Sequence, residues 1–477
     1  MRMMPWSVGA CATLFYLAVH STFYNFDGVA CAIAVDMGDL PHLVHGNHIA
    51  YGLLGLAFHR LWQALGYAGP ALLPLQALDS ILGGAAAGAF CGLLKDLKIP
   101  PLRAVTAAAG LALSYAWWFW SLEPQVYMLG ALFLVLAARE ALSERPRPAV
   151  MGLCHAGAVL GHVGHMAWLP CALYLLGTSY DGRKKKTAII QYGAVLAAAL
   201  LASYAAVAIF IIRPSGQTWR LWLLGSAALS MDKSFSWHGT YSLNNLASWA
   251  LMTLRVFVNP YDLSGTARML GWALAALPLA AAGLGLGASR RLAAACLLWI
   301  AGYAMLYISW EPFTVVYRIS DLIPLWILIA LAAARVRGHW AAAALCAWVA
   351  AAGIFNWQYT IRPHADPKNN VAYQEALWLS ELTPENSWIS AVSIDQVYIP
   401  YFARRRPLNL RYFVNRREAL ARMLADNARA GVPVYVTSPA LATDGWREFF
   451  AAYRLAESGR RGAFVLYRVG GRSRTFR

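Results

Sequence analysis

The sequence is short of charged residues. Asp, Glu, Lys and Arg make up 13% of its 477 residues, against roughly 25% in soluble domains. Hydrophobic residues make up 59%. Apolar runs of about 20 residues, each long enough to cross roughly 30 Å of hydrocarbon, follow one another through most of the chain. This composition excludes a soluble globular protein and predicts a helical protein that crosses a membrane many times.

Signals of several other protein classes are also missing. The seven cysteines lie in or just after apolar runs, and none follows Asn356, so their spacing indicates neither a disulfide framework nor a zinc site. The sequence contains no internal repeat of the kind that a transporter built from two related halves would show. The first 24 residues lack a polar region that ends in a small-x-small cleavage site. We therefore expect them to form a retained first helix.

Apolar runs separated by charged residues predict the membrane-spanning helices. We expect these helices near residues 5–24, 71–94, 104–121, 125–141, 187–212, 267–287, 292–309, 321–335 and 339–356. The stretch 149–178 is interrupted by Gly161, Gly164 and Pro170. This interruption predicts two short helices that meet at membrane depth.

The C-terminal part has a different composition. From Asn356 the sequence turns polar and holds 18 Lys and Arg against 10 Asp and Glu. Short apolar runs alternate there with helical patterns, which predicts a small α/β unit. The expected strands include 388–392, 434–437 and 463–469, and the expected helices include 416–429. The predicted domains are a transmembrane domain at 1–357 and a soluble α/β domain at 358–477.

Basic residues gather in five short loops, at 95–103, 139–147, 183–186, 290–291 and 335–337. The positive-inside rule places these loops in the cytoplasm and gives about eleven crossings, a cytoplasmic N-terminus and an outward C-terminal domain. Two long loops, 25–70 and 213–266, then face outward. Within the first of them, apolar residues at helical spacing in 49–65 predict an amphipathic helix on the membrane surface.

Four stretches on this outer side, at 24–28, 45–55, 118–127 and 161–170, resemble the glycosyltransferase C superfamily when they are taken in order. The resemblance is in particular to the bacterial branch of membrane proteins related to protein O-mannosyltransferases. The stretches place an acidic residue at the head of the outer loop, a His-Gly segment before a surface helix, a tryptophan-rich segment before Val-Tyr, and a second Gly-His segment. The third stretch departs from the superfamily, which has its glutamate directly before Val-Tyr. This chain has Gln125 there and Glu123 two positions earlier.

The resemblance implies an inverting transferase of the bacterial inner membrane with its active site facing the periplasm. Such enzymes take a sugar from a polyprenyl-phosphate carrier and transfer it to an acceptor hydroxyl on the outer face. The implied partners are the lipid-linked sugar, membrane lipids and an acceptor that is a protein, a lipid or a glycan. No nucleic acid is implied.

Transfer from a lipid phosphate needs a base for the acceptor's proton and cations for the departing phosphate, both at the level of the headgroups. Asp27, just after the first helix, is the predicted base. The alternative is that Asp27 caps the helix that follows it, because Asp is favoured at that position. Asp36 and Asp39 are the next carboxylates along the loop.

Two arginines are predicted to bind the phosphate. Arg318 is a lone cation in the outward turn before the 321–335 helix, and Arg255 is the second candidate. Arginine suits bidentate contact with phosphate. Pairing of Arg318 with Glu311 or Asp321, or contact with lipid headgroups, is the alternative.

The resemblance also assigns His45, His48, His162, His165 and Glu123 to substrate binding. His162 and His165 lie in apolar surroundings, where ionisable groups usually face a cavity or a partner. For them the alternative is a hydrogen bond between helices. His42, His45 and His48 recur every third residue, but Pro41 and Gly46 disfavour a helix there and no carboxylate sits at a fixed spacing. The sequence therefore leaves a divalent metal open without indicating one.

Two other classes of function remain open on the sequence. A transporter or flippase of a lipid-linked substrate would be expected to show charges at the centres of its helices, where this chain has little beyond Asp79 and the 155–165 histidines. A non-catalytic subunit of polysaccharide assembly would use the basic C-terminal domain to bind an anionic polymer.

Overall fold

The computed structural model of the chain describes residues 3–224, 240–443 and 445–472, so that part of the predicted 213–266 loop lies outside the described residues. The chain divides into two compact units. The first holds Met1–Ser21 and Ala34–Ala365, and the second holds Thr22–Ile33 and Asp366–Arg477. The second unit therefore includes a short segment from the beginning of the sequence, and that segment contains Asp27.

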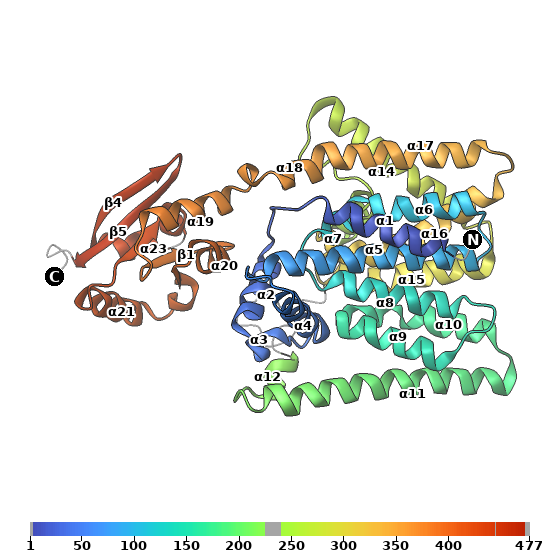
Figure 1. The fold of residues 1–477 in the computed structure, drawn as a ribbon, viewed down its shortest axis with the longest axis horizontal. Helices are drawn as coiled ribbons and strands as arrows, with labels where there is room; N and C mark the ends of the chain where they lie inside the picture. Colours follow the sequence, from blue (N-terminus) through green and yellow to red (C-terminus); the bar gives the residue numbers. More distant parts are fainter. Residues whose placement is uncertain (1–2, 225–239, 444, 473–477) are drawn as a thin grey trace. The chain divides into compact units, whose positions relative to one another are not determined.

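The first unit is helical (Figure 1). Its first part holds α1 (Met4–Leu17), α3 (Leu40–Leu43), α4 (Ala50–Ala64), α5 (Leu72–Asp96), α6 (Pro101–Leu113), α7 (Tyr115–Ser121), α8 (Tyr127–Ala141), α9 (Pro148–Gly161), η1 (Val163–Trp168) and α10 (Leu169–Ser179). Its second part holds α11 (Gly182–Val207), η2 (Ala208–Ile212), α12 (Trp219–Leu224), α13 (Leu243–Arg255), α14 (Gly265–Gly285), α15 (Arg290–Ser309), η3 (Val315–Arg318), α16 (Ile319–Arg335), α17 (Trp340–Asn356), η4 (Trp357–Ile361) and α18 (Arg362–Ala365). The helix α2 (Phe26–Met37) runs from the second unit into the first.

Six helices among the described residues are long and apolar enough to cross a membrane. They are Leu72–Asp96, Gly182–Ile212, Gly265–Gly285, Arg290–Ser309, Val315–Arg335 and Trp340–Ala365, and Met4–Leu17, Pro101–Leu113 and Pro148–Gly161 are shorter apolar helices. The predicted pair of short helices is confirmed as α9 and α10, joined by the 3-10 helix η1. The predicted helix at 49–65 is confirmed as α4.

Two predicted helices have different ends. The first helix was expected to reach residue 24 but ends at Leu17, and polar contacts hold the chain beyond it: Gln76 Nε2 donates to the Ser21 carbonyl oxygen at 2.8 Å. The helix expected at 104–121 is broken at Ser114, whose ψ of 136° is extended. The amide of Tyr115, freed by this break, donates instead to the Phe257 carbonyl oxygen at 2.9 Å, after α13.

The five basic loops lie at one end of the first unit (Figure 1), and polar contacts hold several of them to neighbouring segments. Arg139 at the end of α8 pairs with Asp96 at the end of α5, with 2.7 Å between Nε and Oδ2. Arg103 donates to carbonyl oxygens that follow α16. Arg291 donates to the Ser179 hydroxyl at 2.6 Å. The loops that the sequence predicts to share one side of the membrane therefore share one end of this unit.

The other end of the first unit gathers the predicted outward segments. Asp79, buried in α5, accepts hydrogen bonds from the Tyr51 hydroxyl of α4 and, at 3.0 Å, from the Gln125 amide in the turn between α7 and α8. Trp222 of α12 donates its indole N–H to the Val44 carbonyl oxygen at 2.6 Å. Buried polar contacts thus tie the first outer loop to the helices beneath it.

The second unit contains, in its C-terminal part, a small α/β fold of the kind that the sequence predicted. Its five-stranded sheet has the order β2-β1-β3-β5-β4, with β1 parallel to β2 and β3 and the β3-β5 and β5-β4 pairs antiparallel. Its strands are β1 (Trp388–Ala391), β2 (Arg406–Asn409), β3 (Val434–Thr437), β4 (Tyr453–Arg461) and β5 (Phe464–Arg472), and its helices are η5 (Pro367–Asn369), α19 (Val371–Leu382), α20 (Asp395–Tyr398), η6 (Ile399–Ala403), η7 (Leu410–Phe413), α21 (Arg417–Arg429), α22 (Ser438–Ala442) and α23 (Trp446–Ala451). Buried residues of α21, such as Leu420, pack with Val436 of β3 and Phe450 of α23 in its core.

We expect the basic end of the first unit to face the cytoplasm and the second unit to lie outside. In a background without the seven native cysteines, Ser458→Cys on the exposed surface of β4 should react with an impermeant thiol reagent in intact spheroplasts. Asp181→Cys, exposed beside the basic 183–186 loop, is the matched control and should react only after lysis. The reverse pattern would contradict the orientation.

Candidate functional site

The first outer loop forms a tight turn at His45–His48. The His48 amide donates to the His45 carbonyl oxygen at 2.9 Å, and the two imidazole rings stack with centroids 4.9 Å apart. The Val163 amide of η1 donates to the Asn47 carbonyl oxygen at 2.8 Å. The backbone of the turn is therefore anchored on the junction of the paired short helices.

His162 lies at that junction, where its extended backbone separates α9 from η1. Its Nδ1 accepts a hydrogen bond from the Gly164 amide at 3.1 Å and so caps η1. The centroid of its ring is 5.2 Å from that of Tyr127, at the start of α8, and 6.2 Å from that of Tyr317 in η3.

These contacts bring three of the four resembling stretches and the 311–318 turn together. We call His45, His48, His162, Tyr127 and Tyr317 the histidine-tyrosine cluster. All of these side chains except that of His162 are partly exposed. Although part of His48 is exposed, the protein that surrounds its ring removes most of its hydration, and this desolvation together with the nearby His45 and His162 lowers the pKa of His48 to about 3. His48 is therefore neutral near pH 7 and can exchange hydrogen bonds with a ligand but cannot supply a positive charge.

His165 lies next to His162 and forms hydrogen bonds between helices. The distance from its Nδ1 to the Tyr303 hydroxyl of α15 is 2.7 Å, and its carbonyl oxygen lies 2.9 Å from His155 Nε2. Gly130 of α8 leaves space for the imidazole, because a Cβ there would lie 2.3 Å from His165 Nε2. His165 therefore forms a hydrogen bond between helices, which was the alternative role in the sequence analysis.

Arg318 is only 1% exposed. Its Nη2 lies 2.6 Å from Asp321 Oδ2 and donates to the Thr253 hydroxyl at 2.8 Å. Its guanidinium carbon lies 4.2 Å from the centre of the Trp249 ring, a cation-π distance. Arg318 therefore has the partner Asp321, as one reading of the sequence expected. Its Nε and Nη1 find no hydrogen-bond acceptor among the described residues.

Arg255 lies at the end of α13, the helix that also supplies Trp249 and Thr253 to Arg318. It is partly exposed. Its Nε donates to Asn259 Oδ1 at 3.0 Å, and its guanidinium carbon lies 4.6 Å from the centre of the Tyr261 ring. Both candidate phosphate ligands are therefore positioned by α13 and the residues that follow it.

Glu123 is fully buried in the turn between α7 and α8 and accepts a hydrogen bond from the Ser21 hydroxyl. Asp36 accepts a hydrogen bond from the Ala71 amide at 2.8 Å. Asp39 pairs with His42 at 2.7 Å on the surface. All three carboxylates are thus engaged by groups of the first unit.

Asp27 belongs to the second unit and lies in the first turn of α2. The cap of this helix comes from another residue: Asn25 Oδ1 accepts a hydrogen bond from the Gly28 amide at 2.9 Å. A change at Asp27 would therefore leave this capping bond in place.

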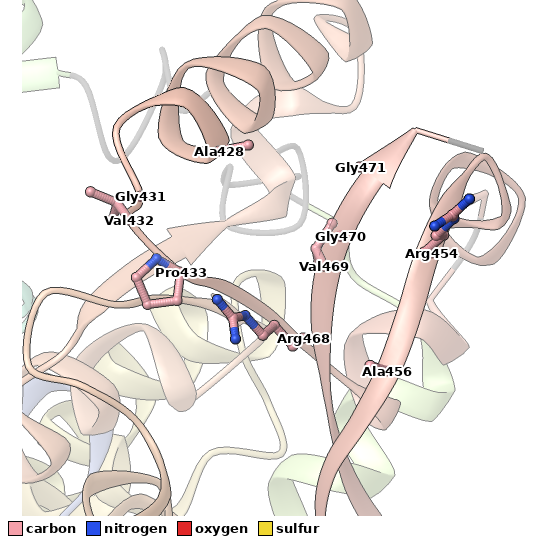
Figure 2. A pocket seen from close by; sticks show the side chains of 10 residues that line it. All are labelled: Ala428, Gly431, Val432, Pro433, Arg454, Ala456, Arg468, Val469, Gly470 and Gly471. Atoms are coloured by element: carbon pink, nitrogen blue, oxygen red, sulfur yellow. The ribbon is translucent and has the colours of Figure 1, made fainter. Parts of the chain in front are cut away.

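No three His, Cys, Asp or Glu side chains in the described part of the chain are arranged to hold a metal ion. A cavity of about 320 Å³ lies in the second unit, at the edge of the sheet (Figure 2). It is lined by Arg454 and Arg468 together with small residues and backbone of α21, β4, β5 and the segment before β3. This cavity contains none of the residues that the sequence singled out.

Several residues of the site had no assigned role in the sequence. Tyr127 and Tyr317 occur within stretches that were singled out for other residues. Tyr307 stacks on Tyr317 with centroids 4.7 Å apart. The sequence signal that could have identified them is the recurrence of aromatic residues at 307, 310 and 317, around the predicted outward turn.

The buried pair of Arg318 and Asp321 predicts a strongly coupled effect on stability. Arg318→Met or Asp321→Leu alone leaves one buried charge without its partner and should destabilise the protein by about 3–5 kcal/mol, whereas the double variant should lose much less than the sum. Thermal unfolding of the purified protein in detergent measures this. Asp426→Ala, which breaks the exposed pair with Arg429, is the control and should change little. Additive losses in the double variant would contradict the coupling.

Comparison with known proteins identifies the fold. No protein-family model and no curated protein matches the chain. Among solved structures, ArnT from Cupriavidus metallidurans bound to undecaprenyl phosphate is similar with a TM-score of 0.66 and 12% identity, over 98% of this chain and 97% of that one. The Archaeoglobus fulgidus oligosaccharyltransferase is similar with a TM-score of 0.52 and 14% identity, over 99% of this chain and 75% of that one. The chain therefore has the glycosyltransferase C fold.

Proposed function

We propose that this chain is an inverting glycosyltransferase that moves a sugar from a polyprenyl-phosphate carrier to an acceptor hydroxyl on the outer face of the bacterial inner membrane. The observation that carries the proposal is the fold, which the chain shares over 98% of its length with a protein solved in complex with undecaprenyl phosphate. The order of the four resembling stretches supports the same superfamily from the sequence.

In the proposed reaction the carboxylate of Asp27 takes the proton of the acceptor hydroxyl while the hydroxyl oxygen attacks the anomeric carbon. The bond between that carbon and the phosphate oxygen breaks, and the phosphate leaves with the electron pair. Attack opposite to the leaving group inverts the anomeric centre. The arginines stabilise the charge that develops on the phosphate.

The two arginines differ in their access to a ligand. Arg255 is partly exposed, so we assign it the first contact with the phosphate. Arg318 is buried but keeps two donor nitrogens, Nε and Nη1, without a hydrogen-bond acceptor in the described residues, so we assign it the deeper contact. A guanidinium with unused donors is suited to an added oxyanion because unmade hydrogen bonds in a buried place are unfavourable.

The histidine-tyrosine cluster is the proposed surface for the sugar. Its partly exposed rings offer both apolar faces and hydrogen-bonding groups, a combination that suits a hydroxylated ring. His165 and Glu123, being buried and engaged within the first unit, enter the proposal as groups that support the walls of this surface.

Substitution of the proposed base tests the function. Asp27→Asn keeps the size of the side chain and the Asn25 cap but removes the basic oxygen, so the transfer rate should fall by about a hundredfold to ten-thousandfold. Release of undecaprenyl phosphate from undecaprenyl-phosphate sugars by the purified protein, with water or an added alcohol as the acceptor of the sugar, measures this rate.

Asp39→Asn is the matched control in the same outer loop, because Asp39 pairs only with the exposed His42 in the described contacts. It should keep its rate within a few-fold of the wild-type protein. Transfer by Asp27→Asn at a similar rate would exclude Asp27 as the base. Absence of transfer by the wild-type protein with every polyprenyl-phosphate sugar offered would contradict the function itself.

A further inference from the structure

The segment before α2 is held by two side chains of the C-terminal domain, within the second unit. Asn370 Nδ2 lies 2.7 Å from the Thr22 carbonyl oxygen and 2.9 Å from that of Phe23. The Tyr398 hydroxyl lies 2.8 Å from the Phe23 carbonyl oxygen and 2.6 Å from that of Tyr24. Two residues more than three hundred positions away in the sequence therefore form hydrogen bonds with three successive carbonyl groups of this segment.

Other contacts hold the side chains of Asn370 and Tyr398 in place. Asn370 caps α19, because its Oδ1 accepts a hydrogen bond from the Tyr373 amide at 3.0 Å. Tyr398 ends α20 and is 1% exposed, and its hydroxyl also lies 3.0 Å from Asn370 Nδ2. We call Asn370 and Tyr398 the clamp. Its two residues lie at the start of α19 and at the end of α20.

The held segment has a conformation that its sequence disfavours. Tyr24 has a φ of 49°, in the left-handed region that residues with a bulky side chain rarely adopt. Its ring centroid lies 5.4 Å from that of Tyr373 and 5.1 Å from that of Phe402. The domain thus supplies both hydrogen bonds and ring contacts that hold Tyr24 in this turn.

The turn at Tyr24 leads directly into the helix that carries the proposed base. Asn25, the next residue, accepts the Gly28 amide with its side chain and the Val29 amide with its carbonyl oxygen. Asp27 lies between these residues, in the first turn of α2. Because a helix propagates the direction of its first turn, the clamp sets the direction in which α2 starts and hence the place of Asp27.

We propose that Asn370 and Tyr398 are positioning residues of the transferase, through which the C-terminal domain holds Asp27 in its working place. This inference rests on the proposed function for its effect on the rate. The clamp itself is a property of the fold that can be measured without the reaction. A simpler reading is that the contacts only fasten the chain to the domain, and the test must separate the two.

Two substitutions each remove the hydrogen bonds that one clamp residue forms with the segment. Tyr398→Phe keeps the buried ring and removes the hydroxyl. Asn370→Asp keeps the acceptor that caps α19 and removes the N–H groups that reach Thr22 and Phe23. The matched controls lie in the same unit and outside the clamp: Tyr435→Phe in β3, and Asn427→Asp in α21, whose Nδ2 donates to the Met423 carbonyl oxygen at 2.9 Å.

Hydrogen exchange gives the first readout. In the wild-type protein the Gly28 and Val29 amides should be protected, and in Tyr398→Phe they should exchange about tenfold faster, as expected for the loss of one hydrogen bond that restrains the start of the helix. Both controls should leave these amides unchanged. Unchanged exchange in both clamp variants would overturn the clamp, whether or not the protein is a transferase.

The kinetics give the second readout. In each clamp variant kcat should fall about tenfold while KM for the undecaprenyl-phosphate sugar stays within about twofold, because a misplaced base affects the chemical step more than donor binding. In the Asp27→Asn background the clamp variants should cause no further loss. Faster exchange with unchanged kcat, or an equal loss in the Asp27→Asn background, would overturn the positioning role. If the wild-type protein transfers no sugar, the proposed function fails, and the exchange measurement still decides on the clamp.

Discussion

An unpaired polar group in an apolar interior is strongly unfavourable, and this constraint shapes the first unit. Where the helix breaks at Ser114, the Tyr115 and Ala116 amides donate to carbonyl oxygens at the end of α13. Asn356 Nδ2 completes the junction by donating to the Leu113 and Phe257 carbonyl oxygens, at 2.9 Å each. The pairing of these groups holds the end of α13 in place, and α13 in turn positions both candidate phosphate ligands.

The same constraint explains how the outer loops converge on one cluster. His162 separates two helices and uses its own imidazole to cap the second one. The His45–His48 turn offers the Asn47 carbonyl oxygen to the Val163 amide of that second helix. A break that would leave backbone groups unpaired thus becomes the place where loops distant in the sequence are joined.

Structural features that depend on neighbouring residues could be predicted from the sequence. Hydrogen bonds between segments far apart in the sequence could not. Gly161, Gly164 and Pro170 act on their own backbone, so the paired short helices were predicted and are confirmed as α9 and α10. The break at Ser114 depends on a carbonyl group more than a hundred positions away. The strand β4 was missed because it is mostly exposed and polar and pairs only with β5, so its sequence shows no apolar alternation.

The candidate site was predicted in part for the same reason. The resemblance assigned His45, His48 and His162, among others, to substrate binding. The structure places these three residues near one another, and their role stays a prediction. The partner of Arg318 was one of several readings, since nothing local distinguishes Asp321 from Glu311. Nothing in the sequence indicated that Asp27 belongs to one unit with the C-terminal domain, because the clamp joins residues that are more than three hundred positions apart.

A density map of the protein with undecaprenyl phosphate bound tests the central claim most directly. The account predicts a phosphate within hydrogen-bonding distance of Arg255 or Arg318, with the polyprenyl chain extending along the membrane-spanning helices. A phosphate bound elsewhere, or an unoccupied and solvent-continuous path through these helices, would contradict the account and favour a transporter.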